Sequence, residues 1–406
     1  MFAITNARLF DGERNLAATT LLVDGRLIRS IGCDVPPGVD VVDADGGTLL
    51  PGLIDSHVHT YLDGLQDALR FGVTTELEMM GFWKPEDRAM VRERDDIADI
   101  RSAGFGVTAP NGHPSELHKR PTVRRPGAPL FTAPTASSPD EAAEFIAARV
   151  AEGADYIKVM VEEGSVLGAP GLPMLTNATL CRAVSEAHKH GKIAIAHALT
   201  LAATEQAVAA GVDGLSHVFI DRLFTEEIVR LIASSGVFVT PCLTLNASIM
   251  GQTGKDLAAD PRVGSKLSPE WMDTLCSCFN TFPQGDMDTV FATVAALHQA
   301  GVDILAGTDV SRPQKHLGGL AHGASLHHEL QLLVAAGLTP IQALSAATSV
   351  PARRFGLGDR GRLARGLRAD LVLVDGDPTS RISDSLSVKA VWRRGVRLAS
   401  LDAVQA

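Results

Sequence analysis

The sequence Pro-Gly-Leu-Ile-Asp-Ser-His-Val-His-Thr at residues 51–60 is the feature that most constrains this fold. Its apolar start is typical of a buried strand, and side chains alternate between the two faces of a strand. His57 and His59 therefore point to one side, while Val58 points to the other. Two imidazoles on one face can bind one metal ion. The alternative is that both histidines are ordinary polar residues at a strand end.

The middle of the chain, residues 51–359, alternates short apolar segments with segments of helical periodicity. This alternation is typical of an α/β fold with a parallel sheet, and eight repeats predict a TIM-like (β/α)₈ barrel. The predicted strands are residues 53–57, 73–78, 105–109, 155–160, 193–197, 214–218, 237–241 and 304–309. The predicted helices include residues 140–151, 177–190, 225–234 and 287–300.

Both ends of the chain contain strand-like segments without helices between them. Residues 1–50 have short apolar runs separated by Gly, Asp and Pro, which are turn signals. Residues 360–406 contain two further runs, at 370–375 and 388–392. We expect the two ends to fold together as one small β-sandwich beside the barrel domain of residues 51–359.

Residues 246–288 form a long insertion after the seventh predicted strand. Long ordered insertions in compact domains are often active-site lids. Because this one is rich in large apolar side chains, a lid here would favour an apolar or aromatic substrate. A satellite core on the barrel exterior, or a contact with a second copy of the chain, is the alternative. The apolar residues concerned are Met250, Trp271, Met272, Phe279 and Phe282.

Charge and cysteine content limit the partners and the compartment. The 406 residues include 37 Lys and Arg against 47 Asp and Glu, a net charge of −10, which argues against nucleic acid or an anionic membrane as partner. The five cysteines are scattered, unlike a disulfide framework. No signal peptide or membrane-length apolar segment is evident. We expect a cytoplasmic protein with a small-molecule substrate, and a homo-oligomer stays open.

A barrel of this kind carries its chemistry at the carboxyl ends of its strands. Taken singly, each candidate side chain there is more often structural. Ligand types from five strands at the same end of one barrel instead predict a metal centre. The candidates are His57 and His59 on the first strand, Lys158 on the fourth, His197 on the fifth, His217 on the sixth and Asp309 on the eighth.

Lys158 is the unusual member, because a lysine within an apolar barrel strand costs several kcal/mol unless it is paired. A protonated amine has no lone pair for a cation. Carbamylation by CO₂ would convert it to N6-carboxylysine, whose two oxygens can bridge two metal ions. An ion pair with an Asp or Glu near the barrel mouth is the alternative, and the neighbouring histidines favour the carbamate.

The ligand set predicts two divalent ions. His57, His59 and Asp309 would hold the first ion, while His197 and His217 would hold the second. Zinc is the default for these ligands, although manganese, iron or cobalt would also fit. Metal binding lowers the pKa of water towards ~7, which supplies a hydroxide nucleophile. Asp309 can take its proton and pass it to a leaving nitrogen.

The ordered set His57-x-His59, Lys158, His197, His217 and Asp309 resembles the amidohydrolase superfamily of metal-dependent hydrolases. The segments 72–75, 153–158 and 366–372 and the region of Thr348 and Pro351 extend the resemblance over nearly the whole chain. It is greatest for the branch of imidazolonepropionase-like proteins and Xaa-Pro or Xaa-Arg dipeptidases. The resemblance implies a binuclear centre with a carbamylated lysine and hydrolysis of an amide-like bond.

Two departures from the family pattern limit what the resemblance implies. Deaminases of the superfamily usually place a glutamate shortly after the fifth-strand histidine, whereas Ala-Leu-Thr follows His197 here, which disfavours deamination. The dipeptidase branch typically has a tyrosine after the seventh strand. This chain reads Pro-Cys-Leu-Thr-Leu-Asn at residues 241–246, so recognition of a peptide carboxylate is in doubt.

Other polar residues are weaker candidates. His113 follows the third predicted strand, where that branch often uses a histidine to contact substrate; a plain loop residue is the alternative. His322 follows the eighth strand and could also face substrate. Glu76 and Glu78 share a face of the second predicted strand, where hydrogen-bonded scaffolding is the expected role.

We therefore predict a hydrolase that cleaves an amide-type C–N bond in an N-acyl amino acid, a dipeptide or a related small amide. The alternative enzyme is a lactonase, an esterase or an organophosphate or carbamate hydrolase with the same binuclear centre. The non-enzymatic alternative is a metal-free protein that keeps the fold for interaction. Such a protein would tolerate the loss of metal ligands, and none of the expected ligands is missing here.

Overall fold

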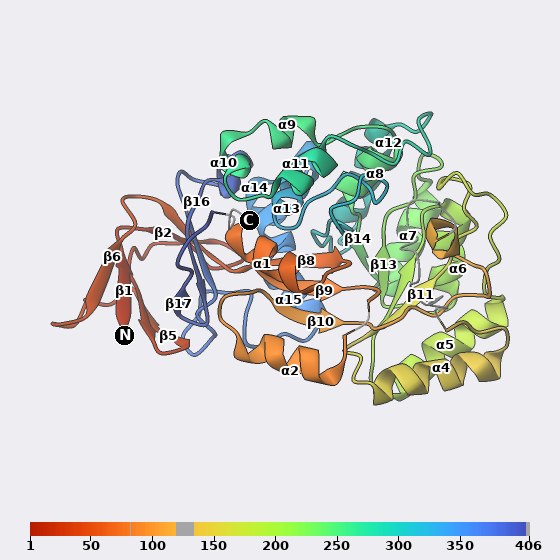
Figure 1. Ribbon diagram of the computed structural model, residues 1–406, viewed down its shortest axis with the longest axis horizontal. Coiled ribbons are helices and arrows are strands. Elements are labelled where there is room, and N and C mark those ends of the chain that lie inside the picture. Colours follow the sequence, from red (N-terminus) through yellow and green to blue (C-terminus); the bar gives the residue numbers. More distant parts are fainter. Residues whose placement is uncertain (82, 119–133, 403–406) are drawn as a thin grey trace.

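The computed structural model describes residues 1–81, 83–118 and 134–402 (Figure 1). A central α/β region carries parallel strands surrounded by helices, and strands from both chain ends lie to one side of it. The central region contains the predicted ligands.

The central strands form two parallel sheets. In the first sheet the strand order is β10-β9-β8, and in the second it is β11-β12-β13-β14. Both sheets are built from consecutive parallel neighbours, as expected when each strand returns through a helix. The strands are β8 (Leu53–Val58), β9 (Val73–Glu78), β10 (Asp99–Ser102), β11 (Ile157–Met160), β12 (Ala194–His197), β13 (Gly214–Ser216) and β14 (Phe238–Thr240).

Backbone hydrogen bonds link the edges of these two sheets. On one side, the Asp155 amide donates to the Ser102 carbonyl at 2.8 Å. On the other side, residues 303–310 run between the sheets: the Val239 amide donates to Asp303 at 2.9 Å, and the His59 amide donates to Val310 at 2.7 Å. The result is a TIM-barrel-like α/β arrangement.

Two predicted strands differ from the structure. Residues 105–109 do not form the third strand, because β10 occupies Asp99–Ser102 and residue Val107 makes only an isolated bridge with Val159. The prediction was wrong because β10 has charged residues that a buried ion network accommodates, whereas the apolar run is flanked by Gly104 at φ +65°. Residues 304–309 also form no continuous strand: Ile304 makes an isolated bridge with Val239, and Val310, just beyond, makes one with Val58.

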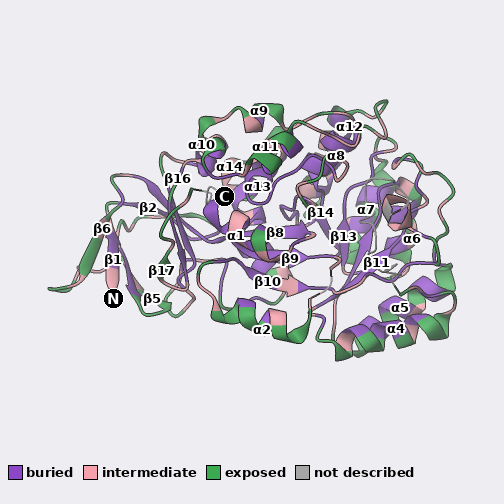
Figure 2. Cartoon of the chain, in the orientation of Figure 1, coloured by how far each residue is buried: buried purple, intermediate pink, exposed green. Residues whose placement is uncertain are grey.

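Helices cover the outside of the strands, and their outward faces are exposed while the strands are buried (Figure 2). Side-chain caps fix several helix starts; Ser138 Oγ, for example, accepts from the Glu141 amide at 3.2 Å. The covering helices are α1 (Leu62–Arg70), α2 (Pro85–Glu93), α4 (Pro139–Ala151), α5 (Asn177–Lys189), α6 (Leu201–Ala209), α7 (Glu226–Ser235), α12 (Met287–Gln299), α13 (Ala324–Ala335), α14 (Pro340–Ala346) and α15 (Ser349–Arg354). Shorter elements are α3 (Ser115–His118) and η2 (Ile382–Leu386).

The predicted insertion at residues 246–288 contains short helices joined by loops and packs on the rest of the protein. Trp271 is 2% exposed, and its indole N–H donates to Asp67 of α1 at 2.8 Å. This packing is typical of the satellite core that we considered as the alternative to a lid. The helices are α8 (Leu243–Ile249), α9 (Lys255–Ala258), α10 (Pro261–Gly264) and α11 (Pro269–Leu275).

Strands from the two chain ends pair with each other. One sheet has the order β17-β16-β15-β7-β2-β3 and the other β5-β4-β1-β6. Ile4, Leu21, Leu49 and Trp392 belong to one buried apolar cluster that the two sheets share. The strands are β1 (Phe2–Thr5), β2 (Arg8–Phe10), β3 (Asn15–Leu16), β4 (Leu21–Asp24), β5 (Leu27–Ile31), β6 (Asp40–Asp43), β7 (Thr48–Pro51), β15 (Leu371–Val374), β16 (Val388–Arg393) and β17 (Val396–Arg397). Residues 403–406 of the predicted sandwich lie outside the described residues.

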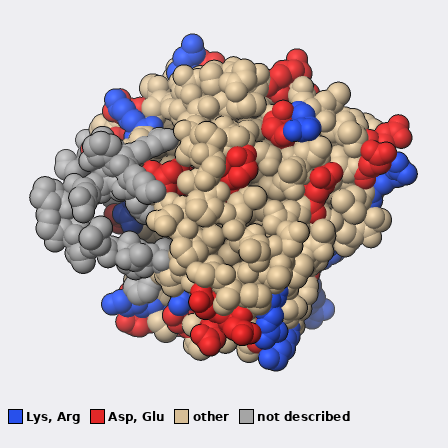
Figure 3. All heavy atoms as spheres, turned by 90° about the vertical axis from the view of Figure 1, so that its right-hand side faces the viewer, with Lys and Arg blue, Asp and Glu red and all other residues tan. Residues whose placement is uncertain are grey.

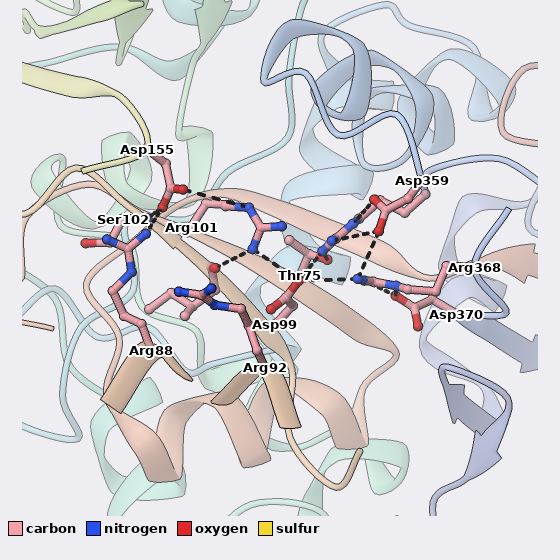
Figure 4. A network of polar contacts seen from close by, with 12 residues as sticks. Thr75, Arg88, Arg92, Asp99, Arg101, Ser102, Asp155, Asp359, Arg368 and Asp370 are labelled. Atoms are coloured by element: carbon pink, nitrogen blue, oxygen red, sulfur yellow. Dashed lines mark hydrogen bonds and ion pairs between the residues drawn. The ribbon is translucent and has the colours of Figure 1, made fainter. Parts of the chain in front are cut away.

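An ion network joins β10 to the C-terminal part of the chain (Figure 4). Asp99 lies 3.2 Å from Arg101, 3.3 Å from Arg368 and 3.7 Å from Arg393, and it also pairs with Arg360. These arginines hold the pKa of the Asp99 carboxyl far below its usual value even though burial opposes them. The network ties a barrel strand to the strands of the chain ends.

The surface carries charge in small groups. On the face shown in Figure 3, acidic and basic side chains alternate among uncharged ones, and the described atoms form no broad patch of one sign. Within the described part of the chain, no helix combines the length and the apolar character needed to cross a bilayer.

Candidate metal centre

His57 and His59 both contact the same oxygen atom of Asp309. His57 lies on β8 and His59 just beyond its end. Their Nε2 atoms lie 3.3 Å and 2.9 Å from Asp309 Oδ1. Asp309 Oδ1 nevertheless has no partner with hydrogen-bond geometry among the described residues. Short contacts between atoms that do not form hydrogen bonds are expected when several ligands point at one shared position.

Two of the predicted ligands have unusual backbone conformations. His217 has φ +73° and Asp309 has φ +61°, the left-handed region that non-glycine residues rarely adopt. His217 directly follows β13. Residues held in this region cost about 1–3 kcal/mol and persist where the surrounding structure imposes them, often at functional sites. The turns that aim these two side chains are therefore part of the site.

His197 and His217 form a second pair. His217 Nε2 lies 3.2 Å from His197 Nδ1 and 3.7 Å from Asp309 Oδ2. The two imidazole rings are nearly perpendicular, at 76°. Asp309 therefore contacts the first pair through one oxygen and the second pair through the other. Five of the six predicted ligands form one continuous cluster.

Lys158, on β11, is the sixth. Its side chain is 1% exposed, and Nζ has no hydrogen-bond partner among the described residues. Burial lowers the pKa of the Lys158 amine to about 8, against the opposing charges of Asp309, Cys242 and Glu78. The predicted alternative of a direct ion pair is absent from the described contacts. The lowered pKa increases the fraction of the amine that is neutral near physiological pH.

Burial also sets the protonation of the histidines. It lowers the pKa of His57 to about 4 and holds the pKa values of His197 and His217 well below the usual value, helped by neighbouring positive groups. Burial lowers the pKa of His59 as well, but Asp309 and Glu78 outweigh it and raise the value. Burial raises the pKa of Asp309, yet His57 and His59 keep it well below its usual range. Neutral His57, His197 and His217 beside an ionised Asp309 are in the forms that bind metal, whereas His59 holds its proton more strongly.

The donors fit a metal centre by their chemistry and placement. His57, His59 and Asp309 each place one ligand atom within 4.8 Å of the others, as do His57, His217 and Cys242. Lys158 adds a buried amine whose Nζ has no hydrogen-bond partner among the described residues. Histidine nitrogen and carboxylate oxygen are the ligands of zinc and related divalent ions.

Glu162 is a site residue that the sequence analysis missed. Its Oε2 lies 3.1 Å from His197 Nε2, and its Oε1 accepts from the Gly164 amide at 2.7 Å. Burial raises the pKa of the Glu162 carboxyl, while His113 and the amides of Gly164 and Leu199 oppose this. Glu162 follows β11 by two residues, and no spacing pattern links it to His197, 35 residues later.

Cys242 is a second residue that was missed. Its buried Sγ lies 3.6 Å from His57 Nδ1, whereas the other ring nitrogen, Nε2, contacts Asp309. Burial raises the pKa of the thiol well above its usual value, and Asp309 acts in the same direction. A protonated thiol is the stable form here. Two Glu329 oxygens accept from the amides of Leu243 and Thr244, which fixes the turn that carries Cys242.

His113 lies against the cluster. Its ring stacks on that of His197, with centroids 4.4 Å apart and an interplanar angle of 30°. Its Nδ1 lies 2.7 Å from Glu116 Oε1, and its side chain is 12% exposed. The structure therefore places His113 beside the ligands with one nitrogen paired to a carboxylate.

His322 lies in a different environment. It is fully buried, with Nδ1 2.7 Å from Glu76 Oε1 and Nε2 3.0 Å from the Ser311 carbonyl. Both ring nitrogens already have protein partners, so the contact with substrate that we considered for His322 has no support here. Glu78 accepts from the Met80 amide at 2.8 Å and the Ser102 hydroxyl at 2.5 Å, contacts typical of scaffolding, and its Oε1 also lies 4.0 Å from His59 Nδ1.

A TIM-barrel-like fold with histidine, carboxylate and lysine side chains converging at strand ends defines a class of barrel proteins with a candidate metal site. Residues 48–398 match the amidohydrolase family. This chain belongs to the amidohydrolase family. The match confirms the resemblance inferred from the sequence.

Two sequence relatives differ in the share of this chain that aligns with them. A dihydroorotase from Pelobacter propionicus is 25% identical over 411 residues, which cover 92% of this chain and 89% of that protein. An adenine deaminase from Lysinibacillus sphaericus is 38% identical over 85 residues, which cover 21% of this chain and 14% of the deaminase. The chain thus spans only a small part of the length of that second relative.

A solved structure matches along its whole length. A Xaa-Pro dipeptidase with bound methionine in its active site is 22% identical, with a TM-score of 0.74 over 98% of this chain and 99% of that one. At this identity the similarity shows the fold alone.

Proposed function

We propose that this chain is a metal-dependent hydrolase that cleaves an amide-type C–N bond in an N-acyl amino acid, a dipeptide or a related small amide. The observation that carries the proposal is the contact of His57, His59 and His217 with the two oxygens of Asp309. Membership of the amidohydrolase family supports it. The proposed substrate classes come from the sequence and remain to be separated by experiment.

In this proposal the centre holds two divalent ions, with zinc as the default metal. His57, His59 and Asp309 would hold one, His197 and His217 would hold the other, and N6-carboxylysine at Lys158 would supply carboxylate oxygens to both. When bound, the ions supply Lewis-acid polarisation of the scissile carbonyl and a water of lowered pKa. The neutral amine that carbamylation requires is favoured by the pKa of about 8 at Lys158.

Asp309 is the proposed proton carrier. Its carboxylate is ionised because the neighbouring His57 and His59 keep its pKa low. It can therefore accept the proton of the attacking water and return that proton to the departing amine, so no net proton is gained or lost. Its side chain is 14% exposed, which leaves it accessible from the site mouth. His113 is proposed to contact the substrate beside it.

The bounds of the two domains and the cellular compartment are also part of the proposal. We propose an eight-stranded barrel of residues 51–359 and a β-sandwich built from residues 1–50 and 360–406. Backbone hydrogen bonds between the central sheets support the first, and the pairing of β7 with β15 supports the second. We also propose a cytoplasmic setting, which five free cysteines support. The proposed substrate is a small molecule.

The deciding experiment combines metal analysis with a substrate panel. Wild type and Lys158→Ala are expressed side by side with Zn²⁺ and bicarbonate, and their metal content is measured. About two ions per chain in wild type and a clear loss in the variant support the bridged centre. A panel of matched amides, carbamates and lactones then separates amide hydrolysis from esterase or lactonase activity. About one ion, unchanged by the substitution, would overturn the carbamate bridge.

A further inference from the structure

The carboxylate of Glu162 contacts the side of the His197 ring that faces away from His217. Its Oε2 lies 3.1 Å from Nε2, while the opposite nitrogen, Nδ1, lies 3.2 Å from His217 Nε2. Glu162 and His217 have no exposed side-chain surface, and the His197 side chain is 7% exposed. Water is therefore a poor substitute for either contact.

The Glu162 contact determines where the single proton of a neutral His197 lies. When Glu162 is ionised, its carboxylate can only accept a hydrogen bond. His197 Nε2–H can therefore donate to Glu162, which leaves the lone pair on Nδ1. In the other tautomer, the Nε2 lone pair would face the carboxylate oxygen at 3.1 Å and the two acceptors would repel each other.

The atom left with the lone pair is the one that faces the rest of the cluster. His197 Nδ1 lies beside His217 Nε2, which in turn lies 3.7 Å from Asp309 Oδ2. A metal ligand that donates its other ring N–H to a carboxylate is held in both tautomer and orientation. Glu162 provides this contact for His197.

The carboxylate is itself held in place. Glu162 Oε1 accepts from the Gly164 amide at 2.7 Å. Gly164 has φ +86°, and a Cβ there would lie 2.0 Å from the Ala169 carbonyl oxygen, so the turn requires glycine. Two oxygens thus have separate tasks, one fixing the loop after β11 and one fixing the ring of His197.

We propose that Glu162 is a positioning residue that holds His197 in its Nε2–H tautomer and thereby sets the affinity of the centre for its second ion. The proposal rests on the metal centre put forward above. In this role Glu162 acts through His197, the ligand that its Oε2 contacts. The neighbouring Glu163 offers a matched control, because among the described residues its carboxylate accepts only from the Ser165 amide, at 3.1 Å, and contacts no histidine.

The first test measures ion affinity. Apo-protein is titrated with Zn²⁺ in competition with a chelator for wild type, Glu162→Ala, Glu162→Gln and Glu163→Ala. Loss of a carboxylate that orients a ligand typically weakens metal binding about 10- to 100-fold. We expect this loss for the second ion in Glu162→Ala and wild-type affinity in Glu163→Ala. Glu162→Gln should retain part of the affinity, because its amide oxygen still accepts from Nε2–H.

The second test observes the tautomer directly. Nitrogen-15 NMR of the metal-free protein reports which ring nitrogen carries the proton, with His197 assigned by the loss of its signal in His197→Asn. We expect Nε2–H in wild type and a mixture of tautomers in Glu162→Ala. An Nδ1–H ring in wild type, or wild-type affinity for the second ion in Glu162→Ala, would overturn the proposal.

These measurements are independent of catalysis. The tautomer is read without metal or substrate, so a substrate panel that shows no amide hydrolysis would reject the proposed function and leave this result standing. Thermal unfolding of each variant checks that the fold is retained. If Glu162→Ala fails to fold, the ion affinity of Glu162→Gln and the tautomer of His197 in wild type still test the proposal.

Discussion

The ring of His113 stacks on the ring of His197 at a centroid distance of 4.4 Å. His113 comes from the loop after β10 and His197 from the end of β12, so the stack joins segments that are 84 residues apart in sequence (197 − 113). His113 Nδ1 is paired with Glu116. His113 is thus oriented beside the ligands, and its described contacts do not include Asp309. Mutation can therefore test whether His113 contacts the substrate or supports metal binding.

We predict that His113→Ala lowers kcat/KM by about 100-fold on the first amide that the substrate panel identifies, because misplacement of a substrate by about 1 Å has costs of this size. Metal content should stay at the wild-type value. Kinetics and elemental analysis check the two parts. His188→Ala is the control, since His188 pairs with Asp213 on the exterior. Loss of metal in His113→Ala would show that the residue supports the ligands instead.

A second prediction concerns Lys158. Because the pKa of its amine is about 8, the reactive neutral form increases as pH rises through 8. At constant dissolved CO₂, uptake of two ions by apo-protein should therefore increase between pH 7 and 9 and should require added bicarbonate at low CO₂. Metal titration and carbon-13 NMR of the carbamate check this. In Lys158→Met, bicarbonate should have no effect; an equal effect there would contradict a carbamate at this position.

Periodicity and spacing predicted most of the central strands and the six converging side chains, because these signals are local. The alternation of His57 and His59 along one strand and the placement of ligands at strand ends require no knowledge of distant contacts. The structure brings these residues together, and their binding of metal stays a prediction. β9 was predicted at the bounds that the structure shows, since its six residues are all buried.

The missed features all depend on contacts between distant parts of the chain. β10 contains Asp99 and Arg101, which an apolar pattern cannot identify as a buried strand; arginines from residues 360–393 make its burial possible. Glu162 and Cys242 gain their roles only from the folded positions of His197 and His57. His322 was a candidate because it follows the eighth strand, but Glu76 and Ser311 occupy both of its nitrogens.

The Asp99 network leads to a prediction about stability. Asp99→Asn removes the negative charge that Arg101, Arg360, Arg368 and Arg393 surround. Loss of one partner from a buried ion network costs about 3–5 kcal/mol, because the remaining charges are uncompensated. Denaturant unfolding should show this decrease, with metal content unchanged in the folded protein.

The control for that measurement is Asp96→Asn. Asp96 is 57% exposed and pairs only with Arg94 among the contacts described. Exposed ion pairs contribute about 0–1 kcal/mol. Equal destabilisation by the two substitutions would contradict a special role for the Asp99 network and would assign the effect to loss of charge in this region generally.

The last prediction concerns acid stability and the buried His327. Its Nε2 lies 2.9 Å from the Phe71 carbonyl and its Nδ1 lies 3.0 Å from the Ser385 hydroxyl. Burial lowers the pKa of His327 from 6.5 to about 4. Between these values the unfolded chain binds the proton more readily than the folded protein. The stability that depends on neutral His327 is therefore complete above about pH 6.5 and decreases as pH falls towards 4.

A shift of this size corresponds to about 3 kcal/mol, since each pKa unit is worth about 1.4 kcal/mol. Between pH 7 and pH 4.5, wild type should lose about 2–3 kcal/mol more unfolding free energy than His327→Gln, which cannot titrate. Denaturant unfolding at the two pH values measures the difference. In His188→Gln, where the replaced histidine is exposed, the loss should match wild type. An identical loss in His327→Gln and wild type would show that other buried groups control acid unfolding.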